Sequence, residues 1–187
     1  MQWNIPNSLT VLRILFIPFF VSLYYFDSGL TPHQVNVLAT AIFGLAAATD
    51  WLDGYFARKL NQTSAFGAFL DPVADKLMVT AALIMLVEFG RVGALIAFII
   101  IGREIAISAL REWMAGIGQG GSVAVAMIGK IKTVAQMVAI LFLLYSDPIG
   151  VINIKLIGQL LILIAAFLTL LSMAYYLKAA WPQMKAK

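Results

Sequence analysis

The chain has 187 residues, of which 62% are hydrophobic and 12% charged, and its formal net charge is +4. Average soluble domains are about half apolar and about a quarter charged, so this composition excludes an ordinary soluble globular protein, a disordered chain and a collagen-like fibre. The complete lack of cysteine excludes a disulfide scaffold, a thiolate metal site and a cysteine nucleophile.

Six apolar stretches follow one another along the chain, separated by polar or turn-forming residues. They cover residues 9–26, 35–57, 72–89, 92–114, 123–145 and 151–177. Each is close to or longer than the roughly 20 residues that a helix needs to cross a bilayer. The second is preceded by Thr31 and Pro32, a pair typical of a helix N-cap followed by the first helical position. The sequence therefore predicts an all-α polytopic membrane protein, a bundle of six transmembrane helices in one integral-membrane domain over residues 1–187.

The basic residues indicate how these helices are oriented. If the N-terminus is cytoplasmic, 11 of the 13 Lys and Arg residues fall on the cytoplasmic side. Cytoplasmic loops carry an excess of such residues in membrane proteins. We therefore expect both termini to lie in the cytoplasm.

Acidic residues are concentrated at the end of the second stretch and the start of the third. Four of the nine fall in one 26-residue window, namely Asp50, Asp53, Asp71 and Asp75. Spacings of three and four residues place each pair on one helix face, and a short connection makes the two helices antiparallel neighbours. Clustered carboxylates stay ionised only beside positive charge, and the hard cations magnesium and manganese prefer oxygen ligands. A site for two metal ions is one interpretation, and a salt-bridge network with Arg58, Lys59 and Lys76 is the alternative.

A second cluster, in the fourth and fifth stretches, is basic. Its members are Arg103, Arg111, Lys130 and Lys132, with Thr133 beside them. Arg103 and Arg111 are eight residues apart and share a helix face, whereas Lys132 points roughly 160° away from Lys130 on a regular helix. A cationic pocket beside the aspartates would suit an acceptor that carries a phosphate. Positive-inside topology and anionic lipid headgroups are the alternatives. Glu104 and Glu112, which each follow an arginine, are interpreted as structural partners of basic groups.

The pattern D-x-x-D-G-x-x-A-R-x8-G-x3-D-x3-D runs without departure from Asp50 to Asp75. It resembles the signature of the CDP-alcohol phosphotransferase family. The resemblance implies metal-dependent transfer of a phosphatidyl-type group from a CDP-linked lipid to an alcohol, with release of CMP. It also implies magnesium or manganese, as two ions, held by Asp50, Asp53, Asp71 and Asp75, with Asp75 also the catalytic base. The nucleotide site would be lined by Gly54, Ala57, Arg58 and Gly67, and Asn7 and Thr10 would contribute to it. The alternative is that Asn7, Thr10 and Arg13 anchor the first helix.

Further segments resemble one branch of that family. They are residues 4–13, 103–112 and 129–133. This resemblance implies sn-glycerol 3-phosphate as acceptor, bound by Arg103, Arg111, Lys130, Lys132 and Thr133. The substrates would be CDP-diacylglycerol and sn-glycerol 3-phosphate, with membrane lipids as surroundings, no nucleic-acid partner and a homodimer as assembly. It also implies a multi-pass protein of the bacterial inner membrane whose active site faces the cytoplasm.

The sequence leaves two alternatives open. The same fold could use another acceptor, such as phosphatidylglycerol, serine or an inositol phosphate. A divalent-cation transporter also carries acidic residues within its membrane helices. A transport path would usually have polar groups on both sides of the midplane, and the outer halves of these stretches are apolar.

Overall fold

The computed structural model describes residues 5–26, 29–59, 65–118 and 127–185. Within these ranges the chain forms six helices, and beyond a single bridge between Ile149 and Ile152 the described residues contain no strand. The helices are α1 (Ile5–Tyr25), α2 (Pro32–Lys59), α3 (Ala65–Glu88), α4 (Ala94–Gly116), α5 (Met127–Tyr145) and α6 (Ile154–Lys185). The predicted all-α class is confirmed.

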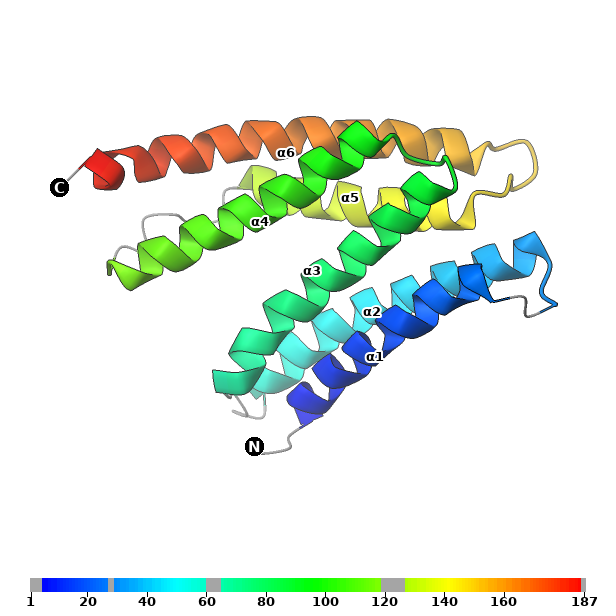
Figure 1. The fold of residues 1–187 in the computed structure, drawn as a ribbon, viewed down its shortest axis with the longest axis horizontal. Helices are drawn as coiled ribbons and strands as arrows, with labels where there is room; N and C mark the ends of the chain where they lie inside the picture. Colours follow the sequence, from blue (N-terminus) through cyan, green and yellow to red (C-terminus); the bar gives the residue numbers. More distant parts are fainter. Residues whose placement is uncertain (1–4, 27–28, 60–64, 119–126, 186–187) are drawn as a thin grey trace.

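The helices pack as two groups of three (Figure 1). α1 contacts α2 and α3, while α6 contacts α4 and α5, and α2 and α3 join the groups through contacts with α5. The two ends of the described chain lie at the same end of the molecule, together with the end of α2 and the start of α3 (Figure 1). We refer to this as the terminal end. Fully buried apolar side chains such as Phe43, Leu83, Ile100 and Leu143 fill the space between the groups.

The helix bounds differ from the apolar stretches, most of all at the start of α3 and at the end of α6, which reaches Lys185, eight residues beyond the predicted stretch. α3 begins at Ala65, seven residues before the predicted stretch, and it contains Asp71 and Pro72. A search for apolar residues stops at a charge, whereas a helix continues through it. Within the described residues, two helical segments are long and apolar enough to cross a membrane, Asn7–Tyr25 and Ile154–Pro182.

The start of α2 matches its prediction in detail. The Thr31 hydroxyl accepts a hydrogen bond from the backbone N–H of Gln34, and the Gln34 side-chain oxygen accepts one from the N–H of Thr31. This reciprocal capping box satisfies two donors that a helix start leaves without helical partners. The predicted cap at Thr31 is confirmed.

The end of the molecule opposite the termini is held together by a polar network. Arg91 donates to the carbonyl oxygens of Leu143 and Leu144, at 3.0 and 2.7 Å, and to the side-chain oxygen of Asn36. Asn36 and His33, both in the first turns of α2, donate to the Asp147 carboxylate. The His33 hydrogen bond is the main reason that the pKa of Asp147 is lowered. This network connects α2 to the end of α5.

Candidate functional site

Three of the four predicted aspartates have described side chains, and they lie at the terminal end of α2 and α3. α1 supplies a hydrogen-bond donor to two of them. The Thr10 hydroxyl donates to Asp71, and Arg13 donates to Asp50 at 2.6 Å. Thr10 and Arg13 are buried, whereas the Asp50 side chain is 44% exposed. α1 therefore orients carboxylates that belong to two other helices.

The donor chemistry of this cluster suits a hard divalent cation. Asp50 and Asp71 each keep a second carboxylate oxygen with no hydrogen-bond partner among the described residues. Among the described side chains no three carboxylate or imidazole groups are arranged to hold one ion. The Asp53 carboxylate, predicted as a ligand, lies outside the described part of the structure, as do the side chains of Ala57 and Arg58 and the surroundings of Gly54.

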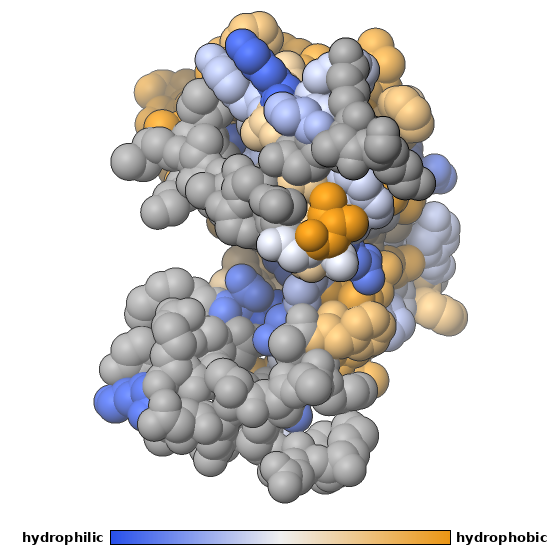
Figure 2. Space-filling view, turned by 90° about the vertical axis from the view of Figure 1, so that its left-hand side faces the viewer, coloured by the Kyte–Doolittle hydropathy of each residue, from blue (hydrophilic) through white to orange (hydrophobic). Residues whose placement is uncertain are grey.

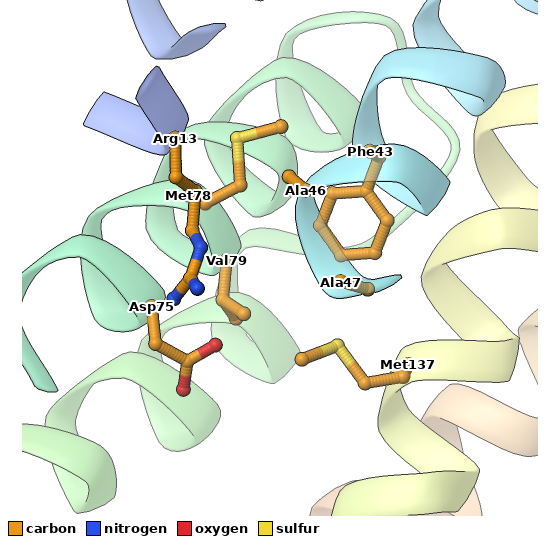
Figure 3. Close-up of a pocket in the computed structure, with 8 residues that line it drawn as sticks. All are labelled: Arg13, Phe43, Ala46, Ala47, Asp75, Met78, Val79 and Met137. Atoms are coloured by element: carbon orange, nitrogen blue, oxygen red, sulfur yellow. The ribbon is translucent and has the colours of Figure 1, made fainter. Parts of the chain in front are cut away.

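A space of about 10 Å³ lies behind Asp75, enough for a single water molecule. The Arg13 guanidinium and the Asp75 carboxylate point toward each other at its polar side, and Met137 of α5 closes it on the opposite side (Figure 3). Its remaining wall is apolar and comes from α2 and α3, including Phe43 and Met78. Arg13 therefore faces Asp75 as well as binding Asp50.

A larger cleft of about 560 Å³ lies between the first half of α3 and the second half of α4. It is lined by Phe69, Pro72, Val73, Asp75, Lys76, Glu104, Ser108, Arg111 and Glu112. The terminal end is hollowed, and hydrophilic side chains are visible inside the hollow (Figure 2). Asp75 makes no hydrogen bond to any described residue, and its electrostatic neighbours include Asp50, Arg13 and Glu104. Asp75 thus lies between Asp50 and the wall of the cleft that α4 forms.

The predicted basic residues divide into two kinds. Arg111 is exposed and lines the cleft, whereas Arg103 and Lys132 are 7% and 3% exposed and do not line it. One oxygen of Glu104 binds both buried cations, Lys132 at 2.9 Å and Arg103 at 3.2 Å. Glu104 is therefore the structural partner that the sequence predicts, whereas Glu112 makes no ion pair with another described residue.

Two residues of α6, Ser172 and Tyr176, hold the arginines of α4 by hydrogen bonds, and neither was predicted from the sequence. Ser172 accepts a hydrogen bond from Arg103 at 3.0 Å, and the Tyr176 hydroxyl accepts one from Arg111 at 2.8 Å. The available signal was a helical spacing of polar residues in an otherwise apolar segment, because Thr169, Ser172 and Tyr176 share one face. In the structure all three are buried.

The other predicted site residues are placed as follows. Asn7 and Gly67 are buried at the terminal end of α1 and α3, and Thr133 is exposed on α5. Lys130 lies on α5, and its side chain is outside the described part of the structure. The structure thus brings Thr10, Asp50, Asp71 and Asp75 together, with Arg111 on the far wall of the adjoining cleft.

Comparison with known proteins points to one family. Residues 3–171 match the family model described as CDP-alcohol phosphatidyltransferase. A CDP-diacylglycerol–glycerol-3-phosphate 3-phosphatidyltransferase of Pseudomonas fluorescens is 51% identical, over 97% of this chain and 92% of its own. Proteins of that name from Shigella flexneri serotype 5b and Yersinia enterocolitica serotype O:8 are each 50% identical, the first over 96% of both chains and the second over 97% of both.

Proposed function

Because the chain belongs to the CDP-alcohol phosphatidyltransferase family, we propose that it transfers the phosphatidyl group of CDP-diacylglycerol to the 1-hydroxyl of sn-glycerol 3-phosphate. The products are phosphatidylglycerophosphate and CMP. One observation carries the proposal: a single cleft has a carboxylate without a hydrogen-bond partner among the described residues, Asp75, on one wall and an exposed arginine, Arg111, on the other. The names of the relatives specify the same donor and acceptor.

In the proposed reaction these two side chains act on the acceptor from the two walls of the cleft. Arg111 binds the phosphate of the acceptor, because a guanidinium offers paired N–H donors to phosphate oxygens. The acceptor hydroxyl gives its proton to Asp75 as its oxygen forms a bond to the phosphorus next to diacylglycerol. The bond from that phosphorus to the bridging oxygen of the pyrophosphate breaks, and CMP leaves with the electron pair. Phosphoryl transfer depends mainly on positioning and charge neutralisation; in this proposal Asp75 and Arg111 position the acceptor, and Arg111 neutralises charge on its phosphate.

The carboxylates at the terminal end also suit the metal dependence that is general in this family. In our proposal Asp50, Asp53, Asp71 and Asp75 hold two ions of magnesium or manganese. When bound, such ions neutralise the charge of the pyrophosphate. Thr10 and Arg13 of α1 support this site, because each fixes the orientation of one carboxylate by a hydrogen bond.

The nucleotide would bind beside these aspartates. We assign this role to Gly54, Ala57, Arg58 and Gly67, with Asn7 and Thr10 from α1. Support comes from the buried positions of Asn7, Thr10 and Gly67 at the same end of the molecule. On the acceptor side, we assign binding of the phosphate to Lys130 and Thr133 together with Arg111. Arg103 and Lys132, which are paired with Glu104, contribute positive charge near this site.

The proposed setting is a bacterial inner membrane that all six helices cross as one domain, with the site and both termini in the cytoplasm. This proposal is supported by large apolar side chains that are exposed on helices other than α1 and α6, which contain the two apolar segments. Leu95 and Phe98 of α4 are 71% and 73% exposed, and Ile84 of α3 is 55% exposed. Such surfaces suit lipid or a second copy of the chain, which agrees with a homodimer.

CMP release tests this function. Detergent-purified protein is given CDP-diacylglycerol, magnesium or manganese, and one acceptor at a time: sn-glycerol 3-phosphate, phosphatidylglycerol, serine or inositol phosphate. We expect release with metal and sn-glycerol 3-phosphate together. Release with another acceptor would overturn the assignment of the acceptor, and folded protein that releases no CMP with any of them would contradict the proposed reaction.

A substitution at Asp75 tests the proposed base. Asp75→Asn should lower kcat by at least about a hundredfold, since general-base catalysis contributes about 10²–10⁴. Glu88→Gln, at the exposed other end of α3, removes one carboxylate charge without touching the cleft and serves as the control. Near-normal turnover by folded Asp75→Asn would show that Asp75 is not the base.

A further inference from the structure

Tyr176 of α6 contacts both arginines of the basic cluster. The Arg103 and Arg111 guanidinium carbons lie 5.6 and 5.0 Å from the centre of its ring. Both distances are within the roughly 6 Å over which a cation is attracted to an aromatic face. The Tyr176 hydroxyl also accepts the hydrogen bond from Arg111. One side chain therefore holds two like charges that α4 carries eight residues apart.

The ring itself is firmly held. Tyr176 is 5% exposed and belongs to a small apolar cluster with Ile107, Leu110 and Met114 of α4 and Ala180 of α6. α4 and α6 are in contact along this region. The tyrosine is therefore a rigid support, since its neighbours fix its position.

Arg111 needs such a support because it is exposed. A free arginine side chain loses rotamer entropy when it is fixed in one position. Its hydrogen bond to Tyr176 is the one that it makes within the described residues, and a guanidinium has five N–H donors. The Tyr176 contact thus fixes the guanidinium at the cleft wall and leaves about four donors for a ligand. A group that is ordered before binding loses less entropy when the ligand arrives.

We propose that Tyr176 is a positioning residue for acceptor binding: it holds the Arg111 guanidinium at the cleft wall, ready for the acceptor phosphate, and keeps Arg103 behind it on the same ring. This inference rests on the proposed function, because it requires an acceptor that carries a phosphate. The phosphate is remote from the reacting hydroxyl, so Tyr176 acts on acceptor binding rather than on the chemical step.

Steady-state kinetics of Tyr176→Phe and Tyr176→Leu test the inference. Tyr176→Phe keeps the ring and removes the hydrogen bond, so the KM for sn-glycerol 3-phosphate should rise about three- to tenfold. Tyr176→Leu keeps apolar volume and removes the ring face as well, and the rise should reach about ten- to a hundredfold. In both variants kcat and the KM for CDP-diacylglycerol should stay within about twofold of wild type, because binding common to ground and transition states changes KM alone.

Tyr175→Phe is the matched control. It deletes the same hydroxyl one position away, on a side chain that is 55% exposed. We expect its three kinetic constants to match those of wild type. If Tyr176→Phe behaves like Tyr175→Phe, or if its kcat and both KM values change together, the positioning role is wrong.

The wild-type measurement separates this inference from the proposed function. If wild type releases CMP with a different phosphate-bearing acceptor, the acceptor assignment fails, and the same KM comparison with that acceptor decides the role of Tyr176. If the acceptor that it uses carries no phosphate, both proposals fail. If wild type uses sn-glycerol 3-phosphate and the Tyr176→Phe KM is unchanged, the inference alone fails.

Discussion

Glu104→Gln should destabilise the protein, because Glu104 is the counter-charge of two buried cations. Its Oε2 atom lies 2.9 Å from the Lys132 amine and 3.2 Å from the Arg103 guanidinium. The two cations are 3% and 7% exposed, so water does not replace the lost charge. Glutamine preserves the shape and one acceptor oxygen while it removes the charge. The variant therefore leaves two neighbouring buried cations without their carboxylate.

The magnitude follows from the geometry. With an effective dielectric constant of about 20, each attraction at about 4 Å between charge centres is worth about 4 kcal/mol before desolvation. Removing one partner of a fully buried pair costs about 3–5 kcal/mol. Glu104 is 33% exposed, so solvent screening reduces the expected loss to about 2 kcal/mol. For a chain of this length that corresponds to a fall in Tm of about 4–8 °C.

Thermal unfolding of detergent-purified variants measures this loss. Glu112→Gln is the control, because it also removes a carboxylate that follows an arginine on α4, and Glu112 is exposed with no ion pair among the described residues. Its Tm should change by less than about 1–2 °C. Adding Lys132→Met to Glu104→Gln should recover part of the loss, since one buried cation is then gone. An unchanged Tm in Glu104→Gln would refute the assignment of Glu104 as the counter-charge.

Three other predictions concern packing, pH and metal. A Cβ on Gly158 would lie 2.8 Å from the buried Leu143 side chain, so Gly158→Ala should cost about 1–3 kcal/mol of unfolding free energy. Thermal unfolding checks this against Gly44→Ala, whose Cβ meets its neighbour at an ordinary 3.7 Å; equal Tm values for the two variants would contradict the close approach of α5 and α6. The lowered pKa of Asp147 means that its hydrogen bond with His33 stabilises the fold above the unfolded pKa of about 3.9 and is lost as pH falls through the folded pKa. Asp147→Asn should therefore lower Tm at pH 5.5, by a loss of less than about 1 kcal/mol of unfolding free energy at this exposed site. The Tm difference from wild type should shrink by pH 3. A difference that grows on acidification would show that the Asp147 carboxylate does not stabilise the fold in this way. EDTA should reduce CMP release to background, and added magnesium or manganese should restore it; full activity in EDTA would argue against the metal role of the aspartates.

Much of the fold and of the acidic cluster could be predicted from sequence because both depend on local spacing. Apolar stretches and the cap at Thr31 located the helices, and three- and four-residue spacings placed the aspartates on helix faces. The start of α3 was less predictable, because hydropathy falls at Asp71 while helical hydrogen bonding continues through it.

Contacts between distant helices could not be predicted in this way. From the sequence, Arg103 and Lys132 could not be distinguished from Arg111. In the structure Arg103 and Lys132 are buried, because Glu104 binds both of them and Ser172 also binds Arg103. The position of Tyr176 over both arginines depends on how α6 packs against α4, which no spacing within one helix specifies.

Incorporation of radiolabelled sn-glycerol 3-phosphate into lipid tests directly whether this protein uses that acceptor. Purified protein with CDP-diacylglycerol and magnesium should move the label into the organic phase as phosphatidylglycerophosphate, with one CMP formed for each labelled lipid. CMP release without label in the lipid, from folded protein, would show that sn-glycerol 3-phosphate is not the acceptor and would contradict the proposed function.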